Sequence, residues 1–352
     1  MKKIFTCLSL ILICVFCGTS CQRMHRYSSL ESVGDRPENI QMTNNDSAVY
    51  LYGDAIYYKS DGFYNMRLFR SDEKGTKRLL SESDLPDQQK IENFRVYKDQ
   101  LYVLAVRQAE TSFFYQVFSD GTYQEICRVP GRIFQWTIYG DDLFYGKYAG
   151  DTDLFEDIYR FGLSSGKEYP IASAARKFSL ENGAILYATG TYDYKISAYD
   201  IATSAQTALC AFSYEKEVDF LAISSQGIAV CSTDELDTLL IYRPGEQKLH
   251  KISLPKEIQQ SAPGQNCLFV TLYNCNENGS DPQPSEQNGL YRIHLKTEKI
   301  EQLSTELEKV YSMFVVSDDC VYAEQSAGRI KNRSEIYRVD AALKKAEPIC
   351  KL

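Results

Sequence analysis

Apolar and polar positions alternate along residues 48–80, and short turn motifs containing Gly, Asp, Lys or Ser interrupt the alternation. The apolar-rich runs fall at residues 50–52, 56–58, 67–70 and 78–80. β-branched and aromatic residues between such turns are typical of hairpin strands. No window sustains the 3.6-residue period of a helix. The pattern therefore predicts four short antiparallel strands.

The same pattern recurs along the rest of the chain. An apolar pair directly after a turn marks each predicted second strand: Ile56-Tyr57, Leu101-Tyr102, Leu143-Phe144, Ile185-Leu186, Ile228-Ala229, Leu268-Phe269 and Val321-Tyr322. Successive pairs lie about 40 to 53 residues apart, close to the period of four-stranded propeller blades. A third-strand signature follows each pair, and in residues 68–70, 158–160, 241–243, 290–292 and 336–338 it ends in Arg.

One four-stranded sheet cannot bury both of its faces alone, whereas sheets packed radially bury each other's faces and leave only short outer edges. The repeats therefore predict an all-β fold, a β-propeller of seven four-stranded blades. Six blades with one odd unit, or eight, are the alternatives. The last repeat ends on its own fourth strand at residues 346–350, so we expect no further strand to latch the ring.

The N-terminus has the pattern of a targeting segment. Lys2 and Lys3 precede an apolar run at residues 4–16, which is too short to span a bilayer as a mature helix. Ser20 before Cys21 matches the lipobox of bacterial lipoproteins, although Gly18 stands where that box prefers Leu. We expect a signal peptide at 1–21 with lipidation at Cys21, which would tether the protein to the cell membrane outside the cytoplasm. Plain secretion is the alternative.

The polar residues 22–46 predict a flexible tether, and 47–352 a single propeller domain. The 352-residue chain carries a net charge of −8, and its Lys and Arg residues are scattered. Nucleic-acid binding needs a basic patch, so we expect no nucleic-acid partner.

Cysteine and histidine offer little material for catalysis or metal binding. The mature part has an odd number of dispersed cysteines: Cys127, Cys210, Cys231, Cys267, Cys275, Cys320 and Cys350. We expect buried free thiols, with a bridge between Cys267 and Cys275 left open. No pair has CxxC spacing, and three histidines leave little for a catalytic triad. We therefore expect no metal site and no cofactor, and the sequence identifies no catalytic residue.

Aromatic residues gather in the predicted loops between second and third strands: Phe63, Tyr64, Phe113, Phe114, Tyr148, Tyr192 and Tyr194. In an antiparallel blade these loops share one ring face with the links between blades. The aromatics therefore form a candidate ligand-binding face for a glycan or a peptide. The alternative is that they extend the strands and pack between blades.

Two other loops have unusual compositions. Residues 150–157 hold four carboxylates, which suit calcium in principle, but the loop departs from the EF-hand pattern and we favour a solvated turn. Residues 274–288 form a long polar insertion with prolines, a candidate partner-specific loop.

The runs at residues 56–61 and 68–75, followed by Leu79, resemble one repeat of bacterial exported proteins of unknown function. That family is similar to the YWTD propellers of the LDL-receptor-related proteins, and residues 336–340 repeat half of the unit. The architecture also resembles TolB-like propellers. The chain does not resemble WD40 proteins, because its single Trp, Trp136, is not followed by Asp. The resemblance implies a fold and an extracytoplasmic location, and it implies no catalytic residue.

Three hypotheses on function follow. The leading one is a membrane-anchored binding or scaffolding lipoprotein that recognises a protein, peptide or glycan through one propeller face. The second is a glycan- or peptide-active hydrolase or lyase that uses channel carboxylates, since acid–base catalysis needs two carboxylates converging on a substrate. The third is a structural or folding accessory in a surface assembly.

Overall fold

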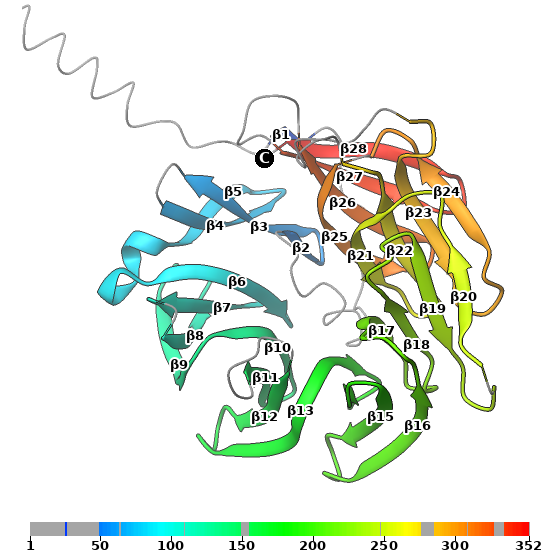
Figure 1. Cartoon of the computed structure of the whole chain (residues 1–352). Coiled ribbons are helices and arrows are strands. Elements are labelled where there is room, and N and C mark those ends of the chain that lie inside the picture. The colour runs from blue at the N-terminus through cyan, green and yellow to red at the C-terminus, as the bar shows by residue number, and fades with distance from the viewer. Residues whose placement is uncertain are drawn as a thin grey trace, which may run out of the picture.

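The computed structural model describes residues 25–26, 49–62, 65–108, 110–148, 155–246, 248–275, 285–307, 309–326 and 334–351. Two 3₁₀ helices, η1 (Glu82–Asp84) and η2 (Pro86–Gln88), are its described helices, and the other named elements are β-strands. The strands form antiparallel units of four, arranged around a ring (Figure 1). Within the described ranges, no helix is long and apolar enough to cross a membrane.

Each unit takes four strands in sequence order. Units 1 and 2 are β2 (Val49–Tyr52), β3 (Ala55–Gly62), β4 (Asn65–Asp72) and β5 (Gly75–Ser81), then β6 (Lys90–Tyr97), β7 (Gln100–Arg107), β8 (Thr111–Val117) and β9 (Tyr123–Pro130). Units 3 and 4 are β10 (Ile133–Tyr139), β11 (Asp142–Tyr148), β12 (Glu156–Gly162) and β13 (Glu168–Glu181), then β13 again with β14 (Ala184–Thr189), β15 (Asp193–Asp200) and β16 (Gln206–Ser213). Unit 5 is β17 (Asp219–Ile223), β18 (Ala229–Ser232), β19 (Thr238–Tyr242) and β20 (His250–Ser253). Units 6 and 7 are β21 (Ile258–Pro263), β22 (Cys267–Leu272), β23 (Gly289–His294) and β24 (Ile300–Ser304), then β25 (Val310–Ser317), β26 (Cys320–Ser326), β27 (Ser334–Asp340) and β28 (Lys345–Lys351).

The 14-residue strand β13 belongs to two units. It pairs with β12 through its first half and with β14 through its second half, so units 3 and 4 form one seven-stranded sheet. The expected all-β fold is confirmed. Because β13 is shared, seven complete blades stay our interpretation of this arrangement.

The predicted strand signatures fall where the sequence places them. The apolar pairs lie in the second strand of each unit, from Ile56 in β3 to Val321 in β26, with Ile228 directly before β18. The second residue of a pair lies opposite a first-strand residue, as Tyr57 opposite Tyr50 and Tyr322 opposite Phe314. All four residues of these two opposed pairs are buried.

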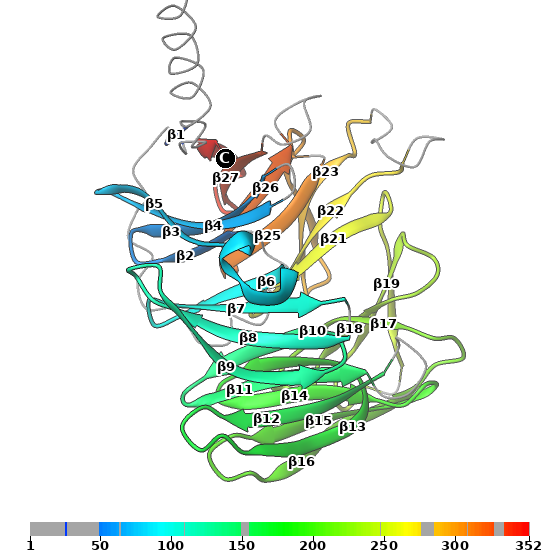
Figure 2. The same ribbon diagram turned by 90° about the vertical axis from the view of Figure 1, so that its left-hand side faces the viewer.

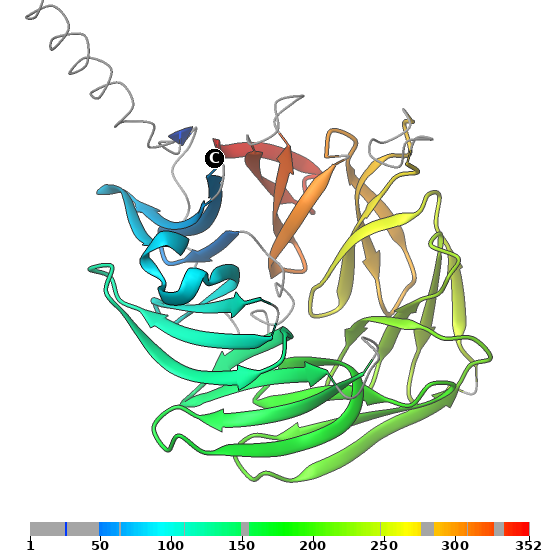
Figure 3. The same ribbon diagram turned by 60° about the vertical axis from the view of Figure 1, so that its left-hand side comes forward.

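The first strands form the inner wall of the ring. Each contacts the first strand of the next unit, and β25 returns to contact β2. Tyr50 of β2 lies at this closure, with its ring 5.1 Å from that of Phe94 in unit 2 and 5.2 Å from that of Phe314 in unit 7, both edge-on. Seen from the flank, neighbouring units are layers packed side by side (Figure 2 and Figure 3). Contacts between aromatic side chains thus join the two ends of the repeat array.

Arg95 of β6 links the inner strands of units 1, 2 and 3. It is 1% exposed, and its guanidinium donates to the Tyr50 hydroxyl and to the Trp136 carbonyl, the latter at 3.3 Å. The side chain of Asn93 and the carbonyl of Phe94 accept further bonds at 3.1 Å. The guanidinium also lies over the Tyr50 and Trp136 rings. A buried guanidinium cannot lose its proton, so these acceptors and ring faces must compensate its charge.

Third-strand arginines join neighbouring units nearer the turns. Arg160 of unit 3 donates to the Ile201 carbonyl of unit 4 at 3.1 Å. Arg292 of unit 6 does the same to the Asp318 carbonyl of unit 7 at 2.8 Å and pairs with Asp319 at 2.7 Å. The repeated Arg of the sequence signature is therefore an inter-unit contact in these units.

The strand directions define two faces of the ring. The turn face carries the turns from first to second and from third to fourth strands. The loop face carries the loops from second to third strands and the links between units. Residues 25–26, part of the predicted tether, form a further strand β1 (His25–Arg26), which pairs with β28 at the outer edge of unit 7. The sequence did not indicate this strand.

We predict that Tyr50→Phe lowers the free energy of unfolding by about 1–3 kcal/mol, because it removes an acceptor of the buried Arg95 guanidinium and keeps the ring. Denaturant unfolding measures the change. The control is Tyr311→Phe, whose side chain is 51% exposed and which should alter stability little. Equal stability of Tyr50→Phe and the parent would show that the hydroxyl contributes nothing to the junction.

Candidate functional site

Three of the predicted aromatic contacts belong to the core. Phe113 and Phe114 lie within β8 and Tyr194 within β15, at 2%, 1% and 1% exposure. The ring of Phe114 packs edge-on against Trp136 at 5.3 Å. The Tyr194 hydroxyl accepts the Val218 backbone N–H at 3.1 Å. The strands β8 and β15 begin earlier than predicted and include these three residues. The expectation that their side chains stand on the loop face is therefore wrong. The alternative holds, in which they extend the strands and pack between units.

The other predicted aromatic contacts are placed differently. Tyr192 is 53% exposed between β14 and β15, and Tyr148 is partly buried at the end of β11. Phe63 and Tyr64 lie outside the described residues. Ligand binding by Tyr148 and Tyr192 stays a prediction.

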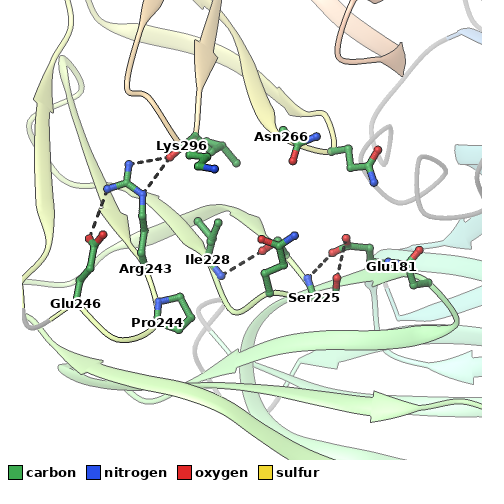
Figure 4. A pocket seen from close by; sticks show the side chains of 13 residues that line it. Glu181, Ser225, Ile228, Arg243, Pro244, Glu246, Asn266 and Lys296 are labelled. Atoms are coloured by element: carbon green, nitrogen blue, oxygen red, sulfur yellow. Dashed lines mark hydrogen bonds and ion pairs between the residues drawn. The ribbon is translucent and has the colours of Figure 1, made fainter.

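A cavity of about 440 Å³ lies on the opposite side of the ring, the turn face of units 4, 5 and 6 (Figure 4). Its surface is polar and apolar in about equal parts, and the residues that line it are Glu181, Asn182, Ser224, Ser225, Gln226, Ile228, Arg243, Pro244, Glu246, Gln265, Asn266, Leu295 and Lys296. These residues come from the turns or strand ends of three successive units. The cavity is therefore a product of the ring and not of one repeat.

Carboxylates of the neighbouring units 4 and 7 hold the two turns that flank the cavity, which belong to units 5 and 6. Glu181 of unit 4 accepts the backbone N–H of Ser225 and, at 2.9 Å, its hydroxyl. Asp318 of unit 7 accepts the backbone N–H of Gln265 at 2.7 Å and the amide of Asn266 at 2.9 Å. The turn of unit 5 is thus bonded to unit 4, and the turn of unit 6 is bonded to unit 7. The space between the turns of units 5 and 6 is left open.

Arg243 closes the base of this space. It donates to the Leu295 carbonyl of unit 6 at 2.8 Å and to Glu298 at 2.7 Å, and its side chain is 14% exposed. Glu246 pairs with it at 3.5 Å, and His250 contacts both Glu246 and Glu298. The charge of Arg243 is therefore already matched by carboxylates.

Several polar groups in the cavity remain available for a ligand. The ammonium of Lys296 is exposed and forms no ion pair or hydrogen bond with the described residues. The exposed side chains of Asn182, Gln226 and Gln265 also make no side-chain hydrogen bond within the described part of the chain. Lys296 lies at the Arg243 end of the cavity, and Glu181 lies at the other end (Figure 4).

A buried carboxyl marks the loop face of unit 3. Glu156 is 7% exposed at the start of β12, and its Oε2 atom has no hydrogen-bond partner among the described residues. Burial raises its pKa from 4.5 to about 7, and the charge of Lys177 opposes that rise. The side chain covers Gly146, where a Cβ would lie 1.8 Å from Oε2. A carboxyl with this pKa can exchange protons near neutral pH.

A second cavity, of about 490 Å³, lies on the strands of units 3 and 4 where β13 passes between them. Tyr159 and Tyr187 line it, together with Asp157 and Lys195. Asp157 already accepts the Ala174 backbone N–H at 3.0 Å. We place the candidate site in the turn-face cavity because hydrogen bonds between neighbouring units hold the turns that form its walls.

The described cysteines are free thiols, as expected: Cys127, Cys210, Cys231, Cys267, Cys275 and Cys320. Cys231 and Cys267 are buried, and the others are partly buried. Burial raises the pKa of the Cys127 thiol to about 12, which keeps it protonated. The bridge between Cys267 and Cys275 is not formed. Among the described residues no group of His, Cys, Asp and Glu could hold a metal, and most of the acidic loop 150–157 lies outside them.

No protein-family model and no curated protein matches the chain. Solved structures are similar to it. The computationally designed Ika8 protein has 11% identity over 92% of this chain and 89% of its own, with a TM-score of 0.56. Oligopeptidase B from Leishmania major has 14% identity over 88% and 49%, with a TM-score of 0.57. The β-propeller domain of the Trilobed protease from Pyrococcus furiosus has 12% identity over 86% and 96%, with a TM-score of 0.57.

This chain thus spans about half the length of oligopeptidase B. At these identities the similarity shows the fold alone. Together with the strand topology, it confirms the predicted β-propeller.

We predict that Glu156 makes the protein less stable as pH rises. Its pKa is about 4.5 unfolded and about 7 folded, so between these values the folded state binds more protons. The free energy of unfolding therefore falls with pH across this window and levels off above it, by about 3 kcal/mol in total. Denaturant unfolding between pH 4 and pH 8 measures this dependence.

Glu156→Gln should remove this part of the pH dependence, whereas Glu215→Gln, at an exposed position, should keep it. The same slope in the parent and in Glu156→Gln would exclude Glu156 as its source.

Proposed function

We propose that this protein is an extracytoplasmic lipoprotein whose propeller binds a peptide segment bearing a carboxylate in the turn-face cavity. The observation that carries the proposal is the cavity itself, which three units build together and which retains the unpaired ammonium of Lys296. Binding sites are typically concave and combine an apolar surface with a few polar groups that fix the ligand.

The lining matches the chemistry of a peptide. The free amides of Asn182, Gln226 and Gln265 can each donate and accept hydrogen bonds, as a peptide backbone requires. Ile228 and Pro244 supply apolar surface for a side chain. The ammonium of Lys296 suits a carboxylate, either of a C-terminus or of an acidic side chain.

A glycan is less suited to this cavity. Sugar recognition commonly stacks a ring on an aromatic side chain, and none of the described residues that line the turn-face cavity is aromatic. Two solved structures similar to this chain belong to proteins named as peptidases, which agrees with a peptide ligand. Because that similarity extends to the fold only, the ligand class rests on the cavity.

The sequence of the N-terminus supports the proposed location. A basic start, an apolar run and Ser20-Cys21 support export and lipidation. The resemblance to exported proteins with YWTD-like or TolB-like propellers supports the same location. In this proposal Cys21 carries the lipid and the propeller remains outside the cytoplasm.

The enzymatic hypothesis has one supporting feature. Glu156 has a pKa near neutrality, as a general acid or base requires. Asp157, the next residue, already accepts the Ala174 backbone N–H. Asp157 therefore does not supply a second carboxylate that converges with Glu156 on a substrate. For this reason we rank binding above catalysis.

The test is binding of a library of short peptides in two forms, with free and with amidated C-termini, measured by native mass spectrometry and calorimetry. The parent should retain acidic or free-acid peptides. Lys296→Gln should weaken the affinity about tenfold or more, because it removes a charge-assisted hydrogen bond.

Lys344→Gln is the matched control, because this exposed lysine lies on the turn face outside the cavity. Gln226→Trp should block the cavity and abolish binding while the fold is kept. Binding that survives in both Lys296→Gln and Gln226→Trp would move the ligand elsewhere, and no binding by the parent would reject the peptide proposal.

A further inference from the structure

The short strand β1 attaches the N-terminal segment to the edge of the ring. β1 lies beside β28 (Figure 1), with His25 opposite Lys351 and Arg26 opposite Cys350 in antiparallel register. The last unit thus carries a fifth strand on its outer side. Only three residues, 22–24, separate β1 from the predicted lipidation site at Cys21.

The direction of β1 determines the face from which the anchor leaves. β28 follows the turn at residues 341–344, so it begins at the turn face and ends at the loop face. Its last residues pair with β1, and Lys351 lies opposite His25. Because the pair is antiparallel, the chain preceding His25 leaves at the loop face. The turn-face cavity opens on the other side of the ring.

The pairing also shortens the reach of the anchor. A free tether from Cys21 to β2 would span up to roughly 90 Å when extended. Four residue steps from Cys21 to His25 span at most about 14 Å. A lipid on Cys21 would therefore hold the loop-face rim of unit 7 close to the membrane surface.

The side chains on the loop face agree with this position. The described part of the chain has five exposed large hydrophobic side chains, and Tyr192, Leu236 and Tyr311 are on the loop face. Tyr311 is the second residue of β25, in the same unit that carries β1, and is 51% exposed. Tyrosine is enriched at membrane interfaces, where its ring meets the acyl boundary and its hydroxyl meets water.

We propose that the pairing of β1 with β28 orients the propeller on a phospholipid surface, with the loop face toward the lipid and the turn-face cavity toward the medium. This inference rests on the lipid anchor of the proposed function. It is independent of the ligand that the cavity takes. β1 is then an orienting device for the lipid anchor.

The pairing itself can be tested with one substitution, because Cys350 is already the register partner of Arg26. Directly opposed residues of an antiparallel pair lie close enough for a disulfide. In the exported full chain, Arg26→Cys should form a bridge to Cys350 under mild oxidation, detected by peptide mapping. Ser29→Cys, outside β1, is the control. Equal bridging to Cys350 by both variants, or none by Arg26→Cys, would overturn the pairing.

The orientation is tested with the lipidated full chain in vesicles of phosphatidylethanolamine and phosphatidylglycerol that carry nitroxide-labelled headgroups. Tyr311→Trp and Leu343→Trp place a tryptophan on opposite faces of unit 7, at positions 51% and 72% exposed. The native Trp136 is buried and serves as the common background. The added emission of Tyr311→Trp should be largely quenched, and that of Leu343→Trp should be retained.

Equal or reversed quenching would overturn the orientation. Arg26→Pro, which removes a backbone donor from β1, should abolish the difference between the two positions while lipidation is kept. Mass spectrometry of the N-terminal peptide shows whether Cys21 carries a lipid. A chain without lipid on Cys21 would overturn this inference together with the anchoring proposal, whereas peptide binding in the cavity would be judged separately by the library experiment.

Discussion

The buried guanidinium of Arg95 is the interaction on which the inner ring depends. Its bonds reach Tyr50 in unit 1 and Trp136 in unit 3, and Tyr50 in turn packs against Phe314 of unit 7. Four successive units, 7, 1, 2 and 3, therefore meet in one contiguous cluster that includes both ends of the repeat array. A charge buried in this way demands acceptors in fixed positions, so the cluster specifies which units adjoin as well as stabilising them.

The same requirement recurs at the turns, where it shapes the cavity. Turns expose backbone N–H groups, and carboxylates from a neighbouring unit satisfy them: Glu181 for the turn at Ser225, and Asp318 for the turn at Gln265. These two carboxylates bond to their turns from opposite directions around the ring. Arg243 then links units 5 and 6 only at the base. An open space between these two turns follows from the direction of the bonds.

The sequence predicted the fold because the fold repeats. Each second-strand pair, such as Ile56-Tyr57, carries the same information as the others, so errors in one repeat are corrected by the rest. The site has no such redundancy. Glu181 and Ser225 stand 44 residues apart, one repeat in sequence, and either alone is an ordinary turn or strand-end residue. The aromatic face was misjudged for a related reason: Phe113 and Tyr194 lie near the start of their strands, where a boundary moved by one or two residues decides between a buried strand and a loop.

Recognition and attachment make opposite demands on a membrane-anchored propeller, since a binding face must stay clear of the surface that holds the protein. A long tether would meet this demand by distance alone, leaving the ring free to rotate and to present either face. The two-residue strand β1 offers a different solution, because an antiparallel pair has a direction. Because β1 enters its pairing with β28 from the loop face, the lipid anchor that we propose would lie on the side away from Glu181 and Lys296. The connectivity of a four-stranded unit thereby separates attachment from ligand binding. Because the fourth strand ends at the loop face, a segment that pairs with its end leaves the turns of the opposite face available for a ligand.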